Sequence, residues 1–119
     1  MCILAKPMKY KLDRSAHSVY SLHYHLVVVT KYRRKALYDE AIRERLKQII
    51  WSLADELGIE ILAQEPAEDH IHILFTATPT TNLSNVVNVI KGVTARRLRQ
   101  EFPQTKEFLW GDSFWSNSY

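Results

Sequence analysis

A helical repeat of apolar residues between Asp39 and Leu57 constrains the fold of this 119-residue chain more than any other feature. Within it, apolar side chains recur at steps of three and four: Ile42, Leu46, Ile49, Ile50, Leu53 and Leu57. On a helix such positions share one face, so the segment must pack against a second layer. Asp39 is expected to cap the start of the helix, and Gly58 to end it in a left-handed turn.

The segments around this helix predict the remaining elements. Asn82 to Phe102 has the same helical repeat, with Leu83, Val86, Val87, Ile90 and Leu98 facing inward. Strands are predicted over Val19–Thr30, Ile59–Gln64, His70–Ala77 and, within the aromatic end, Leu109–Tyr119. Met1–Ser18 is expected to form an irregular arm. The order β-α-β-β-α-β predicts an α+β, ferredoxin-like fold, with a four-stranded antiparallel sheet and two helices on one face.

Length and composition limit the class of protein. At 119 residues, with 46% hydrophobic and 24% charged residues, residues 1–119 are expected to form one globular domain. The single cysteine, Cys2, excludes a disulfide framework and agrees with a cytoplasmic location. No apolar run approaches the roughly 20 residues of a membrane span. The net charge of +3 permits a nucleic-acid partner without requiring one.

His70-Ile71-His72 is the most informative triplet for chemistry. Residues two apart on a strand point the same way, so both imidazoles share one face. Ile71 and Ile73 alternate with them and are expected to pack under the helices, which leaves the histidines on the helix-free face. Two histidines can hold a divalent ion only with a third ligand from elsewhere. A half-buried strand with two hydrogen-bonded histidines is the simpler alternative.

His23-Tyr24-His25 has the same spacing on the first predicted strand. Asp69 beside the later pair, and the clean alternation around it, favour His70 and His72 as the primary site. His25 is then expected to support that site, or to pack, from a neighbouring strand.

Two groups of basic residues could contact nucleic acid. Lys31-Tyr32-Arg33-Arg34-Lys35 sets four cations around one aromatic ring, a composition that binds phosphates and stacks a base. On the second predicted helix, Arg96 and Arg99 face away from the apolar stripe and Lys91 lies on its flank. Either group is equally consistent with an ordinary solvated surface.

Four stretches occur together in one order: Tyr24-His25-Leu26-Val27 with the basic segment at 31–35, Asp69-His70-Ile71-His72-Ile73-Leu74, Lys91-Gly92 with Arg96, Leu98 and Arg99, and Leu109-Trp110 to Ser118-Tyr119. In this order they resemble the transposases of IS200-like insertion sequences. These are single-tyrosine HUH enzymes that cut and rejoin single-stranded DNA.

The resemblance implies a mechanism. His70 and His72 would bind Mg²⁺ or Mn²⁺ with a third, amide or similar, ligand. A tyrosine would attack the DNA, leaving a 5′-phosphotyrosine and a free 3′-hydroxyl. Family members recognise a hairpin in single-stranded DNA. They work as homodimers in which the tyrosine of one subunit completes the site of the other.

The sequence departs from the family pattern in three places. The family's tyrosine and third metal ligand lie on a helix after the last strand, whereas Tyr119 aligns with the end of that strand. We therefore expect that no residue of this chain is the nucleophile, and that the chain is a truncated copy or a fragment. His23 and Arg97 are smaller departures. A non-catalytic nucleic-acid-binding module, and another HUH nuclease such as a replication initiator or relaxase, are the alternatives.

Overall fold

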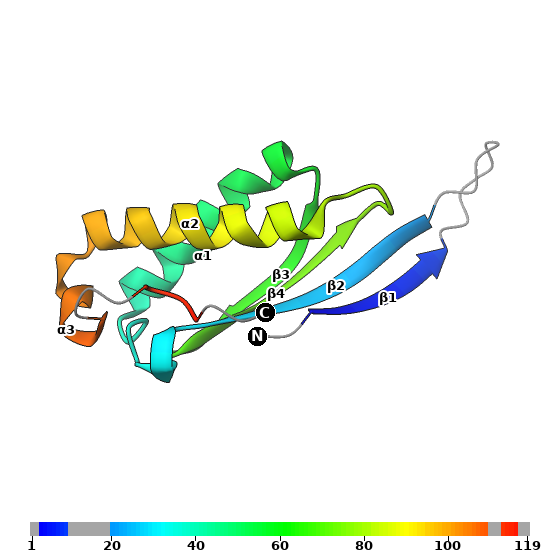
Figure 1. Ribbon diagram of the computed structural model, residues 1–119. Helices are drawn as coiled ribbons and strands as arrows, with labels where there is room; N and C mark the ends of the chain where they lie inside the picture. The colour runs from blue at the N-terminus through cyan, green and yellow to red at the C-terminus, as the bar shows by residue number, and fades with distance from the viewer. Residues whose placement is uncertain (1–2, 10–19, 110–112, 117–119) are drawn as a thin grey trace.

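The fold is an α+β arrangement in which the helices cover one face of an antiparallel sheet (Figure 1). The computed structural model describes residues 3–9, 20–109 and 113–116. The described elements are β1 (Ile3–Lys9), β2 (Tyr20–Val29), η1 (Lys31–Arg33), α1 (Glu40–Leu57), β3 (Glu60–Pro66), β4 (His70–Ala77), α2 (Leu83–Glu101), η2 (Pro103–Thr105) and α3 (Lys106–Leu109). None of the helices in these ranges has the length and apolar character that crossing a bilayer requires.

The helix ends follow the local sequence. The Asp39 carboxylate accepts a hydrogen bond from the Ala41 amide at the start of α1, and Gly58 ends the helix with φ of 70°. The Asn82 side chain caps α2 in the same way by accepting from the Asn85 amide. Both predicted helices are therefore confirmed, including the caps of the first.

The strand order is β1-β2-β4-β3, and every neighbouring pair is antiparallel. Strands β2, β3 and β4 confirm the strands predicted around residues 19–30, 59–64 and 70–77. The core lies between this sheet and the two long helices. Its largest fully buried side chains are Phe75, Phe114, Leu26, Leu37, Ile42, Leu46, Ile49, Ile50, Ile71, Ile73, Ile90 and Leu98.

The outermost strand beside β2 differs from the prediction. The expected irregular arm at 1–18 is wrong over Ile3–Lys9, because this segment forms β1 and pairs with Tyr20 to Leu26 of β2. Pro7 obscured this strand, but an edge strand tolerates a proline because one side of its backbone needs no partner. The order β-α-β-β-α-β is thus wrong at its start, since the strand β1 precedes and pairs with β2.

The last predicted strand is described only at Leu109 and over residues 113–116, and the latter make one short contact with β2. Among the described residues at this end, Trp115 forms an isolated antiparallel bridge with Thr30. The amide of Lys31 donates to Phe114 O, and that of Ser116 donates to Val29 O. The segment 113–116 therefore occupies the edge of β2 just past the point where β1 stops pairing, so the two termini share one strand edge. The rest of the aromatic end, including Trp110 and Tyr119, lies outside the described residues.

Candidate metal centre and nucleic-acid interface

His70 and His72 lie on the face of β4 that the helices leave uncovered. Ile71 and Ile73, which alternate with them, are buried under the helices at 0% and 1% exposure, whereas His72 is exposed. The two imidazole rings lie 5.5 Å apart between centroids, at 62° to one another. The prediction that both histidines share the helix-free face is confirmed.

The neighbouring strands complete this open face. In the register, Val29 is opposite His70 and Val27 is opposite His72 on β2. On β3, Glu65 is opposite His72. His25, Glu65 and His72 line one shallow hollow of about 150 Å³. His25 therefore neighbours the later pair, as expected, whereas His23 lies opposite Thr76 near the other end of β4.

The donor set suits a divalent cation that accepts imidazole nitrogen and leaves positions open. Within residues 20–109 and 113–116, no third His, Cys, Asp or Glu side chain joins the pair to form a three-ligand cluster. Mg²⁺ strongly prefers oxygen ligands, and affinity for nitrogen donors rises along the first transition row from Mn²⁺. The two imidazoles therefore fit Mn²⁺ better than Mg²⁺, provided that oxygen ligands fill the remaining positions.

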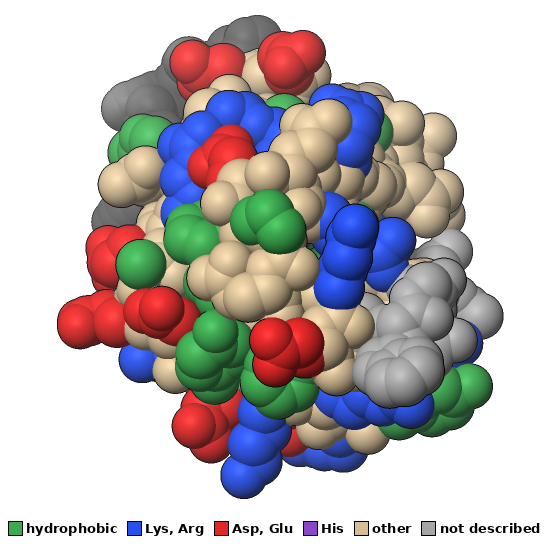
Figure 2. Space-filling view, turned by 90° about the vertical axis from the view of Figure 1, so that its left-hand side faces the viewer, with side chains coloured by type: hydrophobic (Ala, Val, Ile, Leu, Met, Phe, Trp, Pro, Cys, Tyr) green, Lys and Arg blue, Asp and Glu red, His purple; other side chains and the backbone are tan. Residues whose placement is uncertain are grey.

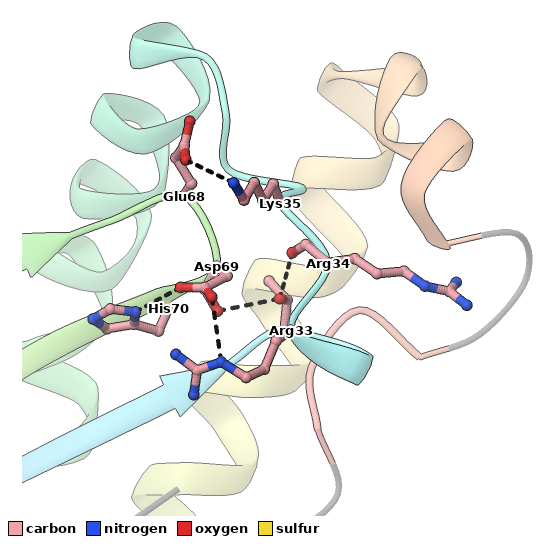
Figure 3. A network of polar contacts seen from close by, with 7 residues as sticks. Arg33, Arg34, Lys35, Glu68, Asp69 and His70 are labelled. Atoms are coloured by element: carbon pink, nitrogen blue, oxygen red, sulfur yellow. Dashed lines mark hydrogen bonds and ion pairs between the residues drawn. The ribbon is translucent and has the colours of Figure 1, made fainter.

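Asp69 connects the histidine pair with the basic segment. Its Oδ1 lies 2.8 Å from His70 Nδ1, and its Oδ2 lies 3.3 Å from Arg33 Nε (Figure 3). The hydrogen bond with His70 is the main reason why the pKa of Asp69 lies below its ordinary value, and the positive charge of Arg33 lowers the pKa further. Asp69 is thus a carboxylate that accepts from both partners. In the sequence, Asp69 stands out only as the residue that precedes the histidine pair.

Thr30 fixes the turn that brings these residues together. This threonine is fully buried, and its amide donates to Asp69 O at 3.0 Å. Its hydroxyl lies 3.1 Å from Asp69 O and 2.5 Å from Arg34 O. Thr30 follows the apolar run that ends at Val29. A hydroxyl side chain at such a strand end can hydrogen-bond to nearby backbone groups, and this is the only sequence feature that indicates its role.

The basic segment presents Tyr32 to solvent. Tyr32 and Arg33 have φ of 57° and 54°, the left-handed region that costs a non-glycine residue roughly 1–3 kcal/mol. The Tyr32 side chain is 68% exposed. Lys31 Nζ lies 5.2 Å and Arg34 Cζ 5.0 Å from the centroid of its ring. An exposed ring flanked by two cations has the composition of a base-stacking platform.

Arg34 and Lys35 of this segment, like Arg33, have protein partners. Arg34 donates to the carbonyl of Phe108 at 2.9 Å, and Lys35 lies 3.7 Å from Glu68. Figure 2 shows this end of the molecule, where Lys and Arg side chains are interspersed with Asp and Glu side chains. The segment is therefore a loop of mixed charge. Arg33 also pairs with Asp69, but its side chain is 65% exposed, so it can still meet a phosphate, as can Lys31.

The basic residues predicted on the outer face of α2 differ in how exposed they are. Arg96 is exposed and Arg99 is partly buried. Lys91 donates to the carbonyl of Ser116 at 2.5 Å, and partial burial lowers its pKa. Lys91 thus supports the C-terminal segment. Arg97, which departs from the family pattern, lies 3.7 Å from Glu101 on the same helix.

The chain is similar in sequence to known transposases and in structure to a solved protein. The family model described as "Transposase IS200 like" matches residues 18–119. ISDra2 transposase TnpA of Deinococcus radiodurans is 38% identical over the whole chain and 83% of its own length. The transposase for insertion sequence element IS200 of Salmonella typhimurium is 32% identical over 87% of this chain and 68% of its own. A crystal structure of a Deinococcus radiodurans protein covers 90% of this chain, and this chain covers 82% of it, with a TM-score of 0.78 and 37% identity.

Proposed function

The chain belongs to the IS200-like transposase family, and on this premise we propose that it binds a hairpin in single-stranded DNA and holds a divalent cation against the bound strand. One observation carries the proposal. The histidine pair lies on an uncovered sheet face, and Asp69 joins His70 directly to Arg33 of the basic segment. A strand whose phosphates contact Arg33 would therefore pass close to the two imidazoles.

Each group has a defined task in this proposal. Lys31 and Arg33 neutralise phosphates, and Tyr32 stacks on an unpaired base. The exposed Arg96 extends the contact along α2. His70 and His72 supply two imidazole ligands, and a bound Mn²⁺ or Mg²⁺ would polarise a phosphate and stabilise the charge that develops during cleavage.

Strand cleavage requires a tyrosine. Its hydroxyl oxygen would lose its proton and form a bond to phosphorus while the bond from phosphorus to the 3′ oxygen breaks, and the 3′ oxygen would take up a proton. Among the tyrosine side chains that the structure describes, Tyr24 is buried under the helices and stacks on Phe75, Tyr38 packs against Phe108, and Tyr32 lies beside Lys31 and Arg34 in the basic segment. We propose that the attacking tyrosine belongs to a segment outside the described residues, and that a second copy of the chain contributes to a complete site.

Fluorescence anisotropy with a labelled hairpin tests the proposed DNA binding. We expect tighter binding to a single-stranded hairpin than to a duplex of the same length, and the affinity should fall as salt increases. Titration of Mn²⁺, followed by the loss of its free electron paramagnetic resonance signal, tests the metal. His72→Ala should weaken Mn²⁺ binding and leave hairpin affinity nearly unchanged. Equal affinity for duplex and hairpin would contradict the proposed DNA specificity.

A further inference from the structure

We propose that Asp69 is a positioning residue that fixes the proton of His70 on Nδ1 and so keeps Nε2 available to a cation. The inference rests on the proposed metal-binding function. It assigns a role to a residue outside the metal ligands and the DNA-contacting cations. The Asp69 carboxylate lies 2.8 Å from His70 Nδ1, the geometry of a hydrogen bond between the two side chains.

The direction of this hydrogen bond follows from the charge of Asp69. An ionised carboxylate only accepts hydrogen bonds, so His70 Nδ1 must carry the proton that it donates. The imidazole then has its lone pair on Nε2, the nitrogen that remains for coordination. Carboxylate–histidine pairs of this kind orient metal ligands and raise their basicity.

Arg33 makes the carboxylate difficult to replace. Arg33 Nε lies 3.3 Å from Oδ2 of Asp69 and can only donate. In Asp69→Asn, the amide oxygen would therefore turn toward Arg33, and the NH₂ group would face His70. Nδ1 would then have to accept, and the proton would move to Nε2, where it blocks coordination. A substitution of one atom would thus reverse the tautomer.

The backbone at Asp69 is independent of its carboxylate. Thr30 donates to the Asp69 carbonyl with both its amide and its hydroxyl, and Asp69→Asn leaves that carbonyl in place. The side chain of Asp69 is also partly exposed. The variant is therefore expected to fold, and Asp69→Ala, which removes the acceptor without supplying an NH₂ group, is the second variant.

Glu68 offers a matched control. It is the adjacent carboxylate, and it pairs with Lys35 at 3.7 Å. Glu68→Gln makes the same change of charge in the same turn without altering the group opposite His70.

Long-range ¹H–¹⁵N correlation spectra of histidine-labelled protein report the tautomer without metal or DNA, at a pH where the imidazole is neutral. We expect wild type and Glu68→Gln to carry the His70 proton on Nδ1, and Asp69→Asn to carry it on Nε2. Mn²⁺ affinity should fall about 10- to 100-fold in Asp69→Asn, as is typical when such a partner is lost. In Arg33→Ala/Asp69→Asn the amide is free to turn, so part of the Nδ1 tautomer should return.

The outcomes separate the two proposals. A wild-type His70 with its proton on Nε2, or an unchanged tautomer in both Asp69→Asn and Asp69→Ala, would overturn the role of Asp69 even if Mn²⁺ binds. Wild-type protein that binds no Mn²⁺ but keeps the Nδ1 proton would support the positioning by Asp69 and contradict the metal function.

Discussion

The indole Nε1 of Trp115 donates a hydrogen bond to the hydroxyl of Thr94 at 2.9 Å, inside the core. Thr94 in turn donates to the carbonyl of Ile90 at 2.6 Å. The bond joins the C-terminal segment to the middle of α2, and Phe114 and Trp115 are buried beside it at 1% and 3% exposure. Phe114 and Trp115 are therefore part of the hydrophobic core, and a buried hydrogen bond from Trp115 to Thr94 holds them to α2.

Thr94→Val is predicted to destabilise the protein by about 1–3 kcal/mol, because a buried indole N–H loses its acceptor while the volume of the side chain is kept. Urea unfolding followed by circular dichroism measures the change. Thr80→Val, at an exposed loop position, is the control and should stay within about 0.5 kcal/mol of wild type. A neutral Thr94→Val would mean that the indole finds another acceptor.

Arg33→Ala/Arg34→Ala is predicted to weaken hairpin binding and to lower the slope of log affinity against log salt. Each lost phosphate contact reduces that slope by about 0.7 for single-stranded DNA. Loss of the Arg33 contact alone would therefore reduce it by about 0.7, and a contact made by Arg34 would add to this. Because Arg34 also donates to Phe108 O, the folded state must be checked by thermal melting.

Arg45→Ala/Lys47→Ala on α1 removes the same number of positive charges and serves as the control. If both double variants lose affinity equally, net charge explains the binding and the basic segment has no special part in it.

A longer protein that carries a tyrosine nucleophile after residue 119 is predicted to form a covalent adduct with DNA when Mn²⁺ is supplied, visible as a shifted band on a denaturing gel. His70→Ala or His72→Ala in that longer protein should abolish the adduct and largely preserve hairpin binding. An adduct on the 119-residue chain that Tyr119→Phe removes would identify Tyr119 as the nucleophile.

Glu101 is predicted to make stability depend on pH in the acid range. It accepts two hydrogen bonds from Arg45, at 2.6 and 3.2 Å, and hydrogen bonding to Arg45 is the main reason why its pKa lies below the ordinary value of 4.5. Because the pKa of Glu101 is lower in the folded state, its contribution to the free energy of unfolding is present above pH 4.5. That contribution is lost as the pH falls through the folded-state pKa. Urea unfolding at a series of pH values should show a shallower acid loss in Glu101→Gln than in wild type.

Sequence patterns predicted the central elements because each satisfies a local rule. Asp39 and Gly58 mark the ends of α1, and Ile71 and Ile73 alternate with His70 and His72 along β4. These features depend on residues only a few positions apart. Periodicity therefore located both helices, three strands and the face on which the histidines lie.

The errors fell where tertiary pairing decides the structure. One edge of β2 pairs with β1 over Tyr20 to Leu26 and with the segment 113–116 near Thr30. No local sequence pattern at Ile3–Lys9 predicted that this segment would pair with β2. Likewise, the helical repeat places Lys91 on the flank of α2, but it cannot show that the carbonyl of Ser116, 25 residues away in the sequence, accepts a hydrogen bond from it. The link from Asp69 to Arg33 depends on how two turns meet, which the sequence does not encode locally.

The position of β4 between β2 and β3 has a consequence for hydrogen exchange and for the thermodynamics of ligand binding. Its backbone is paired on both edges, so its amides are expected to exchange with solvent at the slow, globally limited rate, whereas those of Lys31–Lys35 exchange through local opening. The two imidazoles thus lie on one of the two strands that are paired on both edges. Binding of a cation there would cost the protein little conformational entropy, because its ligands lie on a strand that is already ordered. Binding of DNA would cost more, because it would have to order the loop at Lys31–Lys35.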